Sequence, residues 1–494
     1  MENKHPKGLY LLFATEMWER FSYYGMRAIL ILYLTKALMY DKSVASNLYG
    51  GYVGLIYMTP LIGGFIADKY WGNRRSILTG GTLMSIGQFI LFVSATLKGT
   101  PIGTFLLFLG LGMMIIGNGF FKPNISSMVG SLYSLTDSKR DAAYTIFYMG
   151  INLGSFFGNF ICSILGDTGN PNDFKWAFLA CGIAMALGTI IFYWGKDKYL
   201  FTPDGVGLGI TPIDSPGVKQ VYLWLPVLLV ASLGILYIDA FKYNIVFPFL
   251  VLSAIFICYI IFADKSLTGV EKEKIAVIFI VSFFVIFFWA TFEQAPASLT
   301  FFADEQTDRN LFGWTVPASL FQNLNAFFVV TCAPLMAALW GFLGARKSEP
   351  SSPNKMAIGL LFVTLGYIII EIPLKGILPN VKVSMFYLVA LYLFHSIGEL
   401  CLSPIGMSLV NKLSPKKYVS LLMAVWFLAP AIANKAAGMI SGLYPEPGKT
   451  TSFLGISISN LYEFFLINVG LSGLAALVLF TLTRRLSKLM HGIQ

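Results

Sequence analysis

Long apolar stretches, separated by short polar segments, run along the whole chain. Fourteen of them are about 18–28 residues long, so each predicts a helix that can cross a bilayer. Helices are favoured over a barrel because lipid cannot satisfy open backbone groups and short alternating strands are absent. The pattern therefore predicts an all-α polytopic membrane protein. The predicted spans are 9–35, 46–67, 76–97, 102–130, 142–165, 176–195, 221–238, 246–263, 274–302, 317–342, 356–372, 384–411, 419–441 and 461–482.

Composition agrees with this pattern. Hydrophobic residues make up 56% of the 494 positions and charged residues 12%, whereas soluble proteins contain roughly 45–50% and 25%. These values exclude a soluble globular enzyme, a disordered chain and a nucleic-acid binder. The first stretch is not expected to be a cleaved signal peptide, because it contains Glu16, Glu19, Arg20 and Arg27.

The distribution of Lys and Arg predicts the orientation. With the N-terminus inside and the spans alternating, 22 of the 35 Lys and Arg residues fall in inside loops and nine in outside loops. Four lie within spans: Arg20, Arg27, Lys122 and Lys435. The excess predicts that both termini are cytoplasmic. The net charge of +10 is thus explained by topology, and no nucleic-acid partner is expected.

A polar linker at 196–220 separates six spans from two apolar helices, after which six more follow. Corresponding helices of the two six-helix halves have weakly similar sequences. For example, Lys122-Pro123 in the first half corresponds to Ser403-Pro404 in the second. Parallel six-helix repeats are typical of the major facilitator fold, in which substrate binds between the halves near mid-membrane. The predicted domains are a six-helix bundle at 1–195, a cytoplasmic linker with two additional helices at 196–273, and a second six-helix bundle at 274–494.

Charged residues within spans are costly and mark candidate sites. In the first span, Glu16, Arg20 and Arg27 recur at helical spacing with Tyr23 or Tyr24, and Glu19 lies beside this stripe. The stripe predicts a cavity lining. Arg27 and Glu293 lie at the same depth, 19 residues from their predicted cytoplasmic edges. Lys122 lies at the depth of Glu399 and Glu16. The cross-half pairs Arg27–Glu293 and Lys122–Glu399 are therefore candidate gates.

Other polar features have simpler interpretations. Lys435 is expected to extend to the interface, as are Glu371 and Glu463. His395 is expected to be a hydrogen-bonded packing residue, with a proton relay as the alternative. The segment 442–450 resembles a P-loop, but it has five residues between its glycines, contains two prolines and follows no strand. No nucleotide, metal or cofactor is expected.

The loop 63–75 (GGFIADKYWGNRR) resembles the facilitator-superfamily loop, with Asp68 expected to pair with Arg74 or Arg75. The segment 16–27 (EMWERFSYYGMR) resembles the signature E-x-x-E-R-F-x-Y-Y-G of the proton-coupled oligopeptide transporters of that superfamily. Further segments match the same family: 119–124 (GFFKPN), 147–155 (FYMGINLGS), 289–294 (WATFEQ), 316–325 (VPASLFQNLN) and 398–404 (GELCLSP).

Two departures from the family pattern stand out. Ala326 follows Asn325 where the family usually has Pro, and the span 46–67 lacks the histidine of animal members. The two additional helices are usual in bacterial members. The resemblance thus implies a multi-pass protein of a bacterial inner membrane, with no histidine-based proton step.

The resemblance implies symport of di- and tripeptides with protons and no enzymatic activity. A peptide carboxylate would meet Arg20, Arg27 and Lys122, and its amine would meet Glu399. Protons would use Glu293 and the cluster of Glu16, Glu19 and Arg20. The expected substrate-binding residues are Arg20, Tyr23, Tyr24, Arg27, Tyr57, Lys122, Asn152, Trp289, Glu293, Asn325, Glu399 and Trp426.

Three alternatives remain open at this point. A symporter of nitrate or another anion would leave Glu399 without a ligand. A proton-driven drug exporter would not need three cations. A non-transporting receptor or channel would have no use for ion pairs at two depths.

Overall fold

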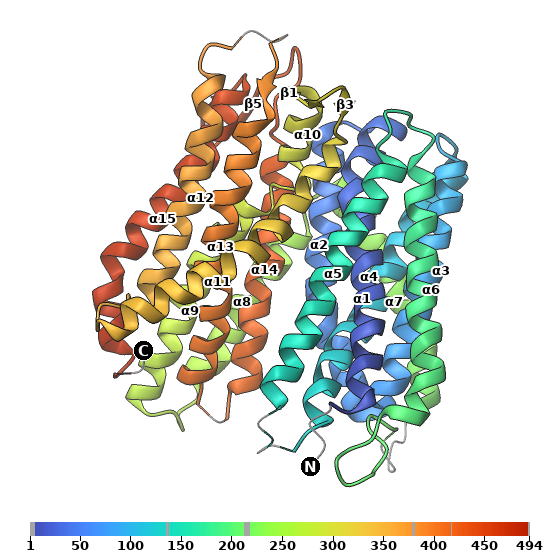
Figure 1. Cartoon of the computed structure of the whole chain (residues 1–494), viewed down its shortest axis with the longest axis vertical. Coiled ribbons are helices and arrows are strands. Elements are labelled where there is room, and N and C mark those ends of the chain that lie inside the picture. Colours follow the sequence, from blue (N-terminus) through green and yellow to red (C-terminus); the bar gives the residue numbers. More distant parts are fainter. Residues whose placement is uncertain are drawn as a thin grey trace. The chain divides into compact units, whose positions relative to one another are not determined.

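The computed structural model describes residues 5–134, 137, 139–211, 218–377, 381–415 and 417–492. Long helices dominate this part of the chain (Figure 1). They are α1 (Lys7–Leu32), α2 (Lys42–Ile66), α3 (Gly72–Thr96), α4 (Pro101–Ser131), α5 (Arg140–Gly166), α6 (Phe174–Tyr199), α7 (Val218–Phe241), α8 (Val246–Ala263), α9 (Gly269–Phe292), α11 (Asn323–Ala345), α12 (Ser352–Glu371), α13 (Met385–Leu413), α14 (Val419–Ser441) and α15 (Leu461–Leu489).

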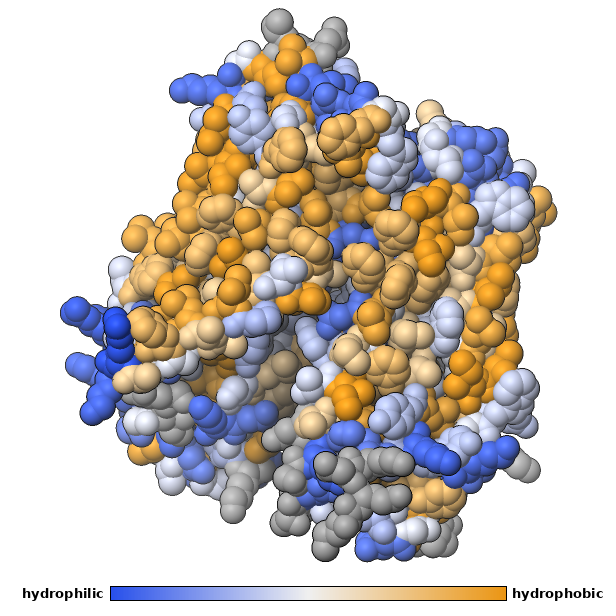
Figure 2. Space-filling view, in the orientation of Figure 1, coloured by the Kyte–Doolittle hydropathy of each residue, from blue (hydrophilic) through white to orange (hydrophobic). Residues whose placement is uncertain are grey.

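These fourteen helices confirm the all-α class, and each falls on one of the fourteen predicted spans. Twelve helical stretches are long and apolar enough to cross a membrane, and the stretch Lys42–Thr96 contains both α2 and α3. The charges of α1 at Glu16, Glu19, Arg20 and Arg27 keep that helix outside the set. Hydrophobic residues cover most of the visible helical surface, and hydrophilic residues gather near helix ends (Figure 2).

The remaining elements are short. They are the helix α10 (Ser298–Glu305), the π-helices η1 (Tyr33–Ala37) and η2 (Ala67–Trp71), the 3-10 helices η3 (Ala318–Gln322) and η4 (Ile372–Leu374), and the strands β1 (Thr307–Asp308), β2 (Asn310–Leu311), β3 (Trp314–Thr315), β4 (Val383–Ser384), β5 (Thr451–Phe453) and β6 (Ile456–Ile458). Strand β1 pairs in parallel with β4, whereas β2–β3 and β5–β6 are antiparallel hairpins.

Two predicted spans are not continuous helices. The span 274–302 ends as α9 at Phe292, and the chain turns before α10 starts at Ser298. The span 317–342 begins with the 3-10 helix η3, which leads into α11. Hydropathy did not reveal either interruption, because the residues on both sides are equally apolar.

Contacts divide the chain into two compact units. Unit 1 contains residues 1–40 and 55–243, and unit 2 contains residues 41–54 and 244–494. The division falls within α2, and it places α7 in unit 1 and α8 in unit 2.

Glycines allow close helix packing in unit 1. A Cβ atom on Gly154 of α5 would lie 2.2 Å from the carbonyl oxygen of Met17, and one on Gly158 would lie 2.4 Å from that of Phe21. Small residues one turn apart let two membrane helices approach closely. The glycines of α5 thereby hold the charged helix α1 against it.

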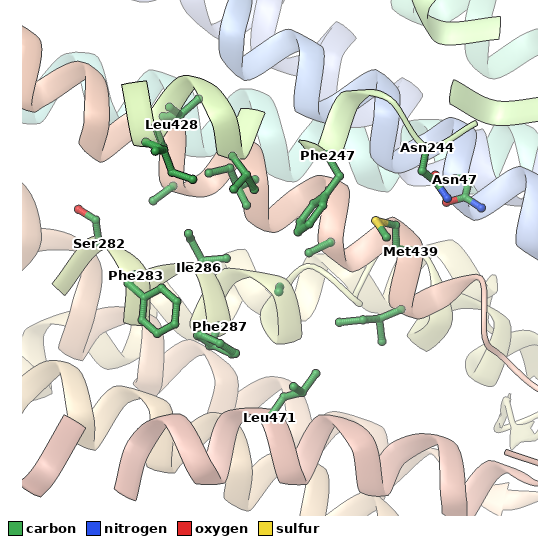
Figure 3. Close-up of a pocket in the computed structure, with 18 of the residues that line it drawn as sticks. Asn47, Asn244, Phe247, Ser282, Phe283, Ile286, Phe287, Leu428, Met439 and Leu471 are labelled. Atoms are coloured by element: carbon green, nitrogen blue, oxygen red, sulfur yellow. The ribbon is translucent and has the colours of Figure 1, made fainter. Parts of the chain in front are cut away.

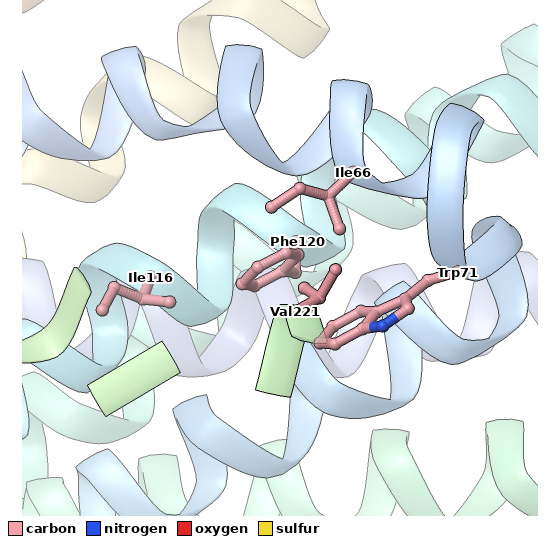
Figure 4. Close-up of a cluster of buried hydrophobic side chains, with 5 residues drawn as sticks. All are labelled: Ile66, Trp71, Ile116, Phe120 and Val221. Atoms are coloured by element: carbon pink, nitrogen blue, oxygen red, sulfur yellow. The ribbon is translucent and has the colours of Figure 1, made fainter. Parts of the chain in front are cut away.

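The additional helix α7 packs against α4 in unit 1. Near its start, Val221 joins a buried cluster with Ile66, Trp71, Ile116 and Phe120 (Figure 4). The cluster connects α7 to α2, η2 and α4 through apolar contacts.

The loop after α2 corrects one prediction. Arg74 forms its ion pair with Asp197, at 2.8 Å between Nη1 and Oδ1, and not with Asp68. Its Nε also donates to the carbonyl oxygen of Leu208 at 2.6 Å. The arginine therefore fastens α3 to the segment that follows α6, a partner too distant in sequence for spacing to reveal.

Candidate functional site

The first half of the candidate site is a buried charge cluster on α1 in unit 1. The Nε of Arg20 lies 2.8 Å from Oε1 of Glu16 and 2.7 Å from Oε2 of Glu19. The three residues are at most 2% exposed. Because an isolated buried ion is costly, each charge here depends on the others.

Helix α4 adds two residues to this cluster. The amide nitrogen of Asn118 donates to Oε1 of Glu19 at 3.2 Å. The ammonium of Lys122 interacts electrostatically with Arg20, Glu19 and Glu16. Together with Lys122, the helix α1 group has no net charge when all four side chains are ionised. The structure thus brings Lys122 of α4 together with Glu16, Glu19 and Arg20 of α1.

Aromatic rings lie beside the cations. Lys122 lies over the ring of Tyr57 at 4.6 Å, and the guanidinium of Arg20 lies 5.7 Å from the ring centre of Tyr23. Tyr23 and Tyr24 contact each other edge to face at 5.1 Å. These contacts place three of the predicted tyrosines next to the charges and give the cations faces with favourable electrostatics.

Two predicted residues of unit 1 lie further from these contacts. Arg27 is 6% exposed, two turns along α1 from Arg20, and interacts electrostatically with Lys122. Asn152 of α5 donates to the carbonyl oxygen of Tyr148, one turn back in its own helix, at 2.9 Å.

The second half of the candidate site lies in unit 2 and contains two carboxylates. The amide nitrogen of Asn325 on α11 donates to Oε2 of Glu399 on α13 at 2.9 Å. Its distance to the hydroxyl oxygen of Ser396 is 3.1 Å. Glu399 also interacts electrostatically with Glu293. Unit 2 therefore holds Glu399 against a neutral hydrogen-bond donor and within electrostatic range of Glu293.

Glu293 lies where α9 ends. It is the residue after Phe292, and its backbone nitrogen makes the last helical hydrogen bond, to Trp289, at 2.8 Å. Because α9 ends here, the position of the Glu293 carboxylate depends on the residues packed around the break and not on a continuous helix. Glu293 is 9% exposed.

Gln294 fixes this break by four hydrogen bonds. Its Nε2 donates to the carbonyl oxygens of Ala290 at 3.0 Å and Ala437 at 3.2 Å. Its Oε1 accepts from the hydroxyls of Ser298 and Ser441, both at 2.6 Å. The side chain thus connects the end of α9 to the start of α10 and to α14.

Aromatic residues pack around the break. Trp289 contacts Phe292 at 5.1 Å, and the His395 ring packs against Phe292 at 5.8 Å and Tyr367 at 4.9 Å. His395 is 1% exposed, so it packs in the core as expected. Trp426 of α14 is 5% exposed and lies over Gly406, where a Cβ atom would be 2.1 Å from its ring.

Lys435 corrects another prediction. It does not extend to an interface but is fully buried. Its Nζ donates to Oδ1 of Asn244 at 3.1 Å and to the carbonyl oxygen of Asn47 at 3.4 Å. Depth along α14 suggested the interface, but neighbouring helices supply oxygen acceptors within the protein.

Sequence reasoning missed Asn118 and Gln294 as parts of the site. Asn118 lies one turn before Lys122, so that helical spacing could have suggested it. Gln294 follows an intramembrane acid directly, but its partners Ser441 and Ala437 are about 145 residues away. No local pattern identifies such contacts.

The comparisons with known proteins agree on one family. The family model described as POT family matches residues 74–456. The chain is 34% identical to an uncharacterized transporter, YclF, of Bacillus subtilis over 472 residues, covering 92% of each chain. It is 33% identical to the peptide transporter YePEPT of Yersinia enterocolitica, covering 89% of this chain and 88% of that protein.

Solved structures are similar over nearly the whole chain. A crystal structure of a peptide transporter POT in complex with alafosfalin has a TM-score of 0.83 and 32% identity, covering 99% of this chain and 96% of that one. A POT family transporter in complex with 5-aminolevulinic acid has a TM-score of 0.82 and 31% identity, covering 98% and 97%.

Proposed function

The chain belongs to the POT family, and on this premise we propose that it imports di- and tripeptides together with protons by alternating access. It is a multi-pass membrane protein of a transporter class. We further propose a bacterial inner membrane with both termini cytoplasmic, because the positively charged loops fall on that side. The partners are then peptides, protons and the lipid bilayer.

The observation that carries this proposal is that unit 1 holds cations beside aromatic rings and unit 2 holds two embedded carboxylates. Unit 1 presents Arg20 and Lys122 beside aromatic rings. Unit 2 presents Glu399, which accepts from the amide of Asn325, and Glu293 at the end of α9. A zwitterionic peptide has one end for each set. Its carboxylate would be held by Arg20, Arg27 and Lys122, and its amine by Glu399.

The remaining predicted residues receive supporting roles. Asn152 and Asn325 would hydrogen-bond the peptide backbone. The charged residues would recognise the two ends of the peptide. The side chains of the peptide would then contact aromatic residues, which tolerate many shapes. These are Tyr23, Tyr24, Tyr57, Trp289 and Trp426.

Proton coupling would begin in the unit 1 cluster. Arg20 forms ion pairs with both Glu16 and Glu19. A peptide carboxylate would compete for Arg20 and Lys122, and the released glutamate would then be easier to protonate. In unit 2, Glu293 would carry a proton when Arg27 is distant, because an approaching arginine competes with the proton for the carboxylate.

Transport into liposomes tests the proposal. An inward proton gradient should drive accumulation of labelled dialanine, whereas Glu293→Gln should lose accumulation at least tenfold and retain peptide exchange. The matched control is Glu463→Gln. Glu463 lies at the start of α15, where its Oε2 accepts from the backbone nitrogen of Ser459 at 2.7 Å. Dialanine amidated at its C-terminus should compete poorly.

Three results would contradict this function. Normal accumulation by Glu293→Gln removes its proton role, and equal competition by the amidated peptide removes the carboxylate as trigger. Proton-driven uptake of nitrate without uptake of dialanine, or export of a drug, would favour an alternative substrate class.

We also propose the pairs Arg27–Glu293 and Lys122–Glu399 as gates on opposite sides, because each pair shares a depth in the sequence. Each single charge reversal should abolish uptake. Reversing both members of one pair should restore part of the uptake, measured as labelled dialanine in liposomes. Reversal across pairs, such as Arg27→Glu with Glu399→Arg, is the control and should restore none. Equal rescue by both combinations would refute the pairing.

A further inference from the structure

A large apolar cavity lies within unit 2, away from the carboxylates. Its volume is about 900 Å³, and helices α8, α9 and α14 contribute most of its lining (Figure 3). Phe247 and Val251 line it from α8, Phe283 and Phe287 from α9, and Val425 and Leu428 from α14. None of these residues has a role in the function proposed above.

The cavity exists because α8 and α9 both pack against α14 and leave space between themselves. At one end the two helices meet, where Phe262 of α8 and Phe279 of α9 lie 6.1 Å apart. The cavity is open, because its lining residues Ile255 and Phe283 are 58% and 54% exposed. An unfilled apolar groove of this size forfeits dispersion contacts along its walls. Among membrane-spanning helices, acyl chains are the available apolar filler.

Ser282 lies beside Phe283 at one end of the cavity, and two asparagines lie at the other end (Figure 3). Asn47 and Asn244 lie together there, far from Phe283 and Leu428 (Figure 3). Lys435 donates to Oδ1 of Asn244 at 3.1 Å and so fixes that amide. Oδ1 of Asn47 is buried and accepts no hydrogen bond from the protein. A buried acceptor without a donor costs about 1–3 kcal/mol, so this end is suited to a ligand that carries a hydrogen-bond donor.

The dimensions fit a lipid. The lining residues of α14 extend from Val425 to Ile440, which is about 23 Å at 1.5 Å per residue. This exceeds the thickness of one leaflet, which is about half of the roughly 30 Å hydrocarbon core. An acyl chain can therefore lie along the helices with its headgroup at the asparagines.

We propose that this cavity is a site for phosphatidylethanolamine. Its acyl chains fill the space between α8 and α9, and its ammonium donates to Oδ1 of Asn47. The lipid completes the packing of α8, which is otherwise held in unit 2 mainly by α14. This inference does not depend on the transported substrate.

Photo-crosslinking tests the site. The full-length protein is reconstituted in nanodiscs with phosphatidylethanolamine that carries a diazirine on one acyl chain, and adducts are located by mass spectrometry. Adducts should concentrate on cavity residues of α8, α9 and α14. Unlabelled phosphatidylethanolamine should compete at least fivefold better than phosphatidylcholine, whose quaternary ammonium cannot donate.

Variants separate the acyl chains from the headgroup. Ala254→Trp and Ala436→Phe fill the cavity and should each reduce the adducts at least fivefold. Ala338→Trp, on the exposed surface of α11, should leave them unchanged. Asn47→Leu should keep the adducts but remove the preference for ethanolamine.

Several outcomes would overturn the proposal. Adducts spread evenly over exposed helices would show annular lipid without a site, and cross-links to a second copy of the chain would assign the cavity to a dimer interface. Equal competition by phosphatidylcholine or phosphatidylglycerol in the wild type would exclude recognition of the ethanolamine. That measurement does not require any variant to fold.

Discussion

The charged groups of the two units are held in opposite ways. In unit 1, Glu16, Glu19 and Arg20 form ion pairs on one uninterrupted helix, which glycines of α5 hold in place. In unit 2, Glu293 lies at a helix break, and Glu399 accepts a hydrogen bond from a neutral amide. Ion pairs on a packed helix depend on each other, whereas a carboxylate at a break depends on backbone geometry. Loss of a charge should therefore lower both stability and transport in unit 1, and affect mainly coupling in unit 2.

The largest effect is expected from removing the central cation of unit 1. Arg20→Met leaves two carboxylates buried without their counter-ion, which should cost about 3–5 kcal/mol. The measurement is the free energy of unfolding in detergent by denaturant titration. Transport should also be lost.

A charge-balanced variant sharpens this prediction. Combining Arg20→Met with Glu16→Gln and Glu19→Gln removes all three charges, so stability should return towards the wild type while transport stays absent. If Arg20→Met is as stable as the wild type, the cluster is not mutually dependent and the contrast between the units fails.

An intermediate effect is expected from Gln294→Leu in unit 2. The change leaves two hydroxyls and two carbonyl oxygens without their hydrogen-bond partner, which should cost about 1–3 kcal/mol. Because the break positions Glu293, the pH profile of dipeptide uptake should change as well. The measurements are unfolding in detergent and initial uptake rates across external pH.

A glutamine of unit 1 provides the matched control. Gln88 is equally buried, and its amide donates to the hydroxyl of Ser22 at 3.2 Å. Gln88→Leu should lower stability similarly and leave the pH profile unchanged. Identical pH profiles for the two variants would show that Gln294 has only a structural role.

The same contrast explains what the sequence could predict. The fourteen spans and the charged stripe of α1 follow from hydropathy and from the helical period, which are local properties. The break at Glu293 does not, because its stability comes from Ser441 and Ala437 on a distant helix. Lys435 was misplaced for the same reason, since Asn244 supplies an acceptor that depth along one helix cannot reveal. Charges paired within one helix are readable from spacing, and polar contacts between helices are not.

The smallest effect is expected from an ion pair outside the membrane spans. Hydrogen bonds from Lys417 at 2.6 Å and Tyr418 at 2.6 Å hold the pKa of Asp264 below its usual range. A lowered pKa in the folded state stabilises the fold above the unfolded pKa of about 3.9, and this contribution is lost as pH falls below that value. Asp264→Asn should therefore lower Tm slightly at pH 7, and the difference should shrink towards pH 3.

Because Lys417 is exposed, 1 M salt should also reduce the difference in Tm between Asp264→Asn and the wild type, whereas the loss of stability in Arg20→Met should persist in salt. A salt-sensitive defect in Arg20→Met would mean that the unit 1 cluster is solvated like this surface pair.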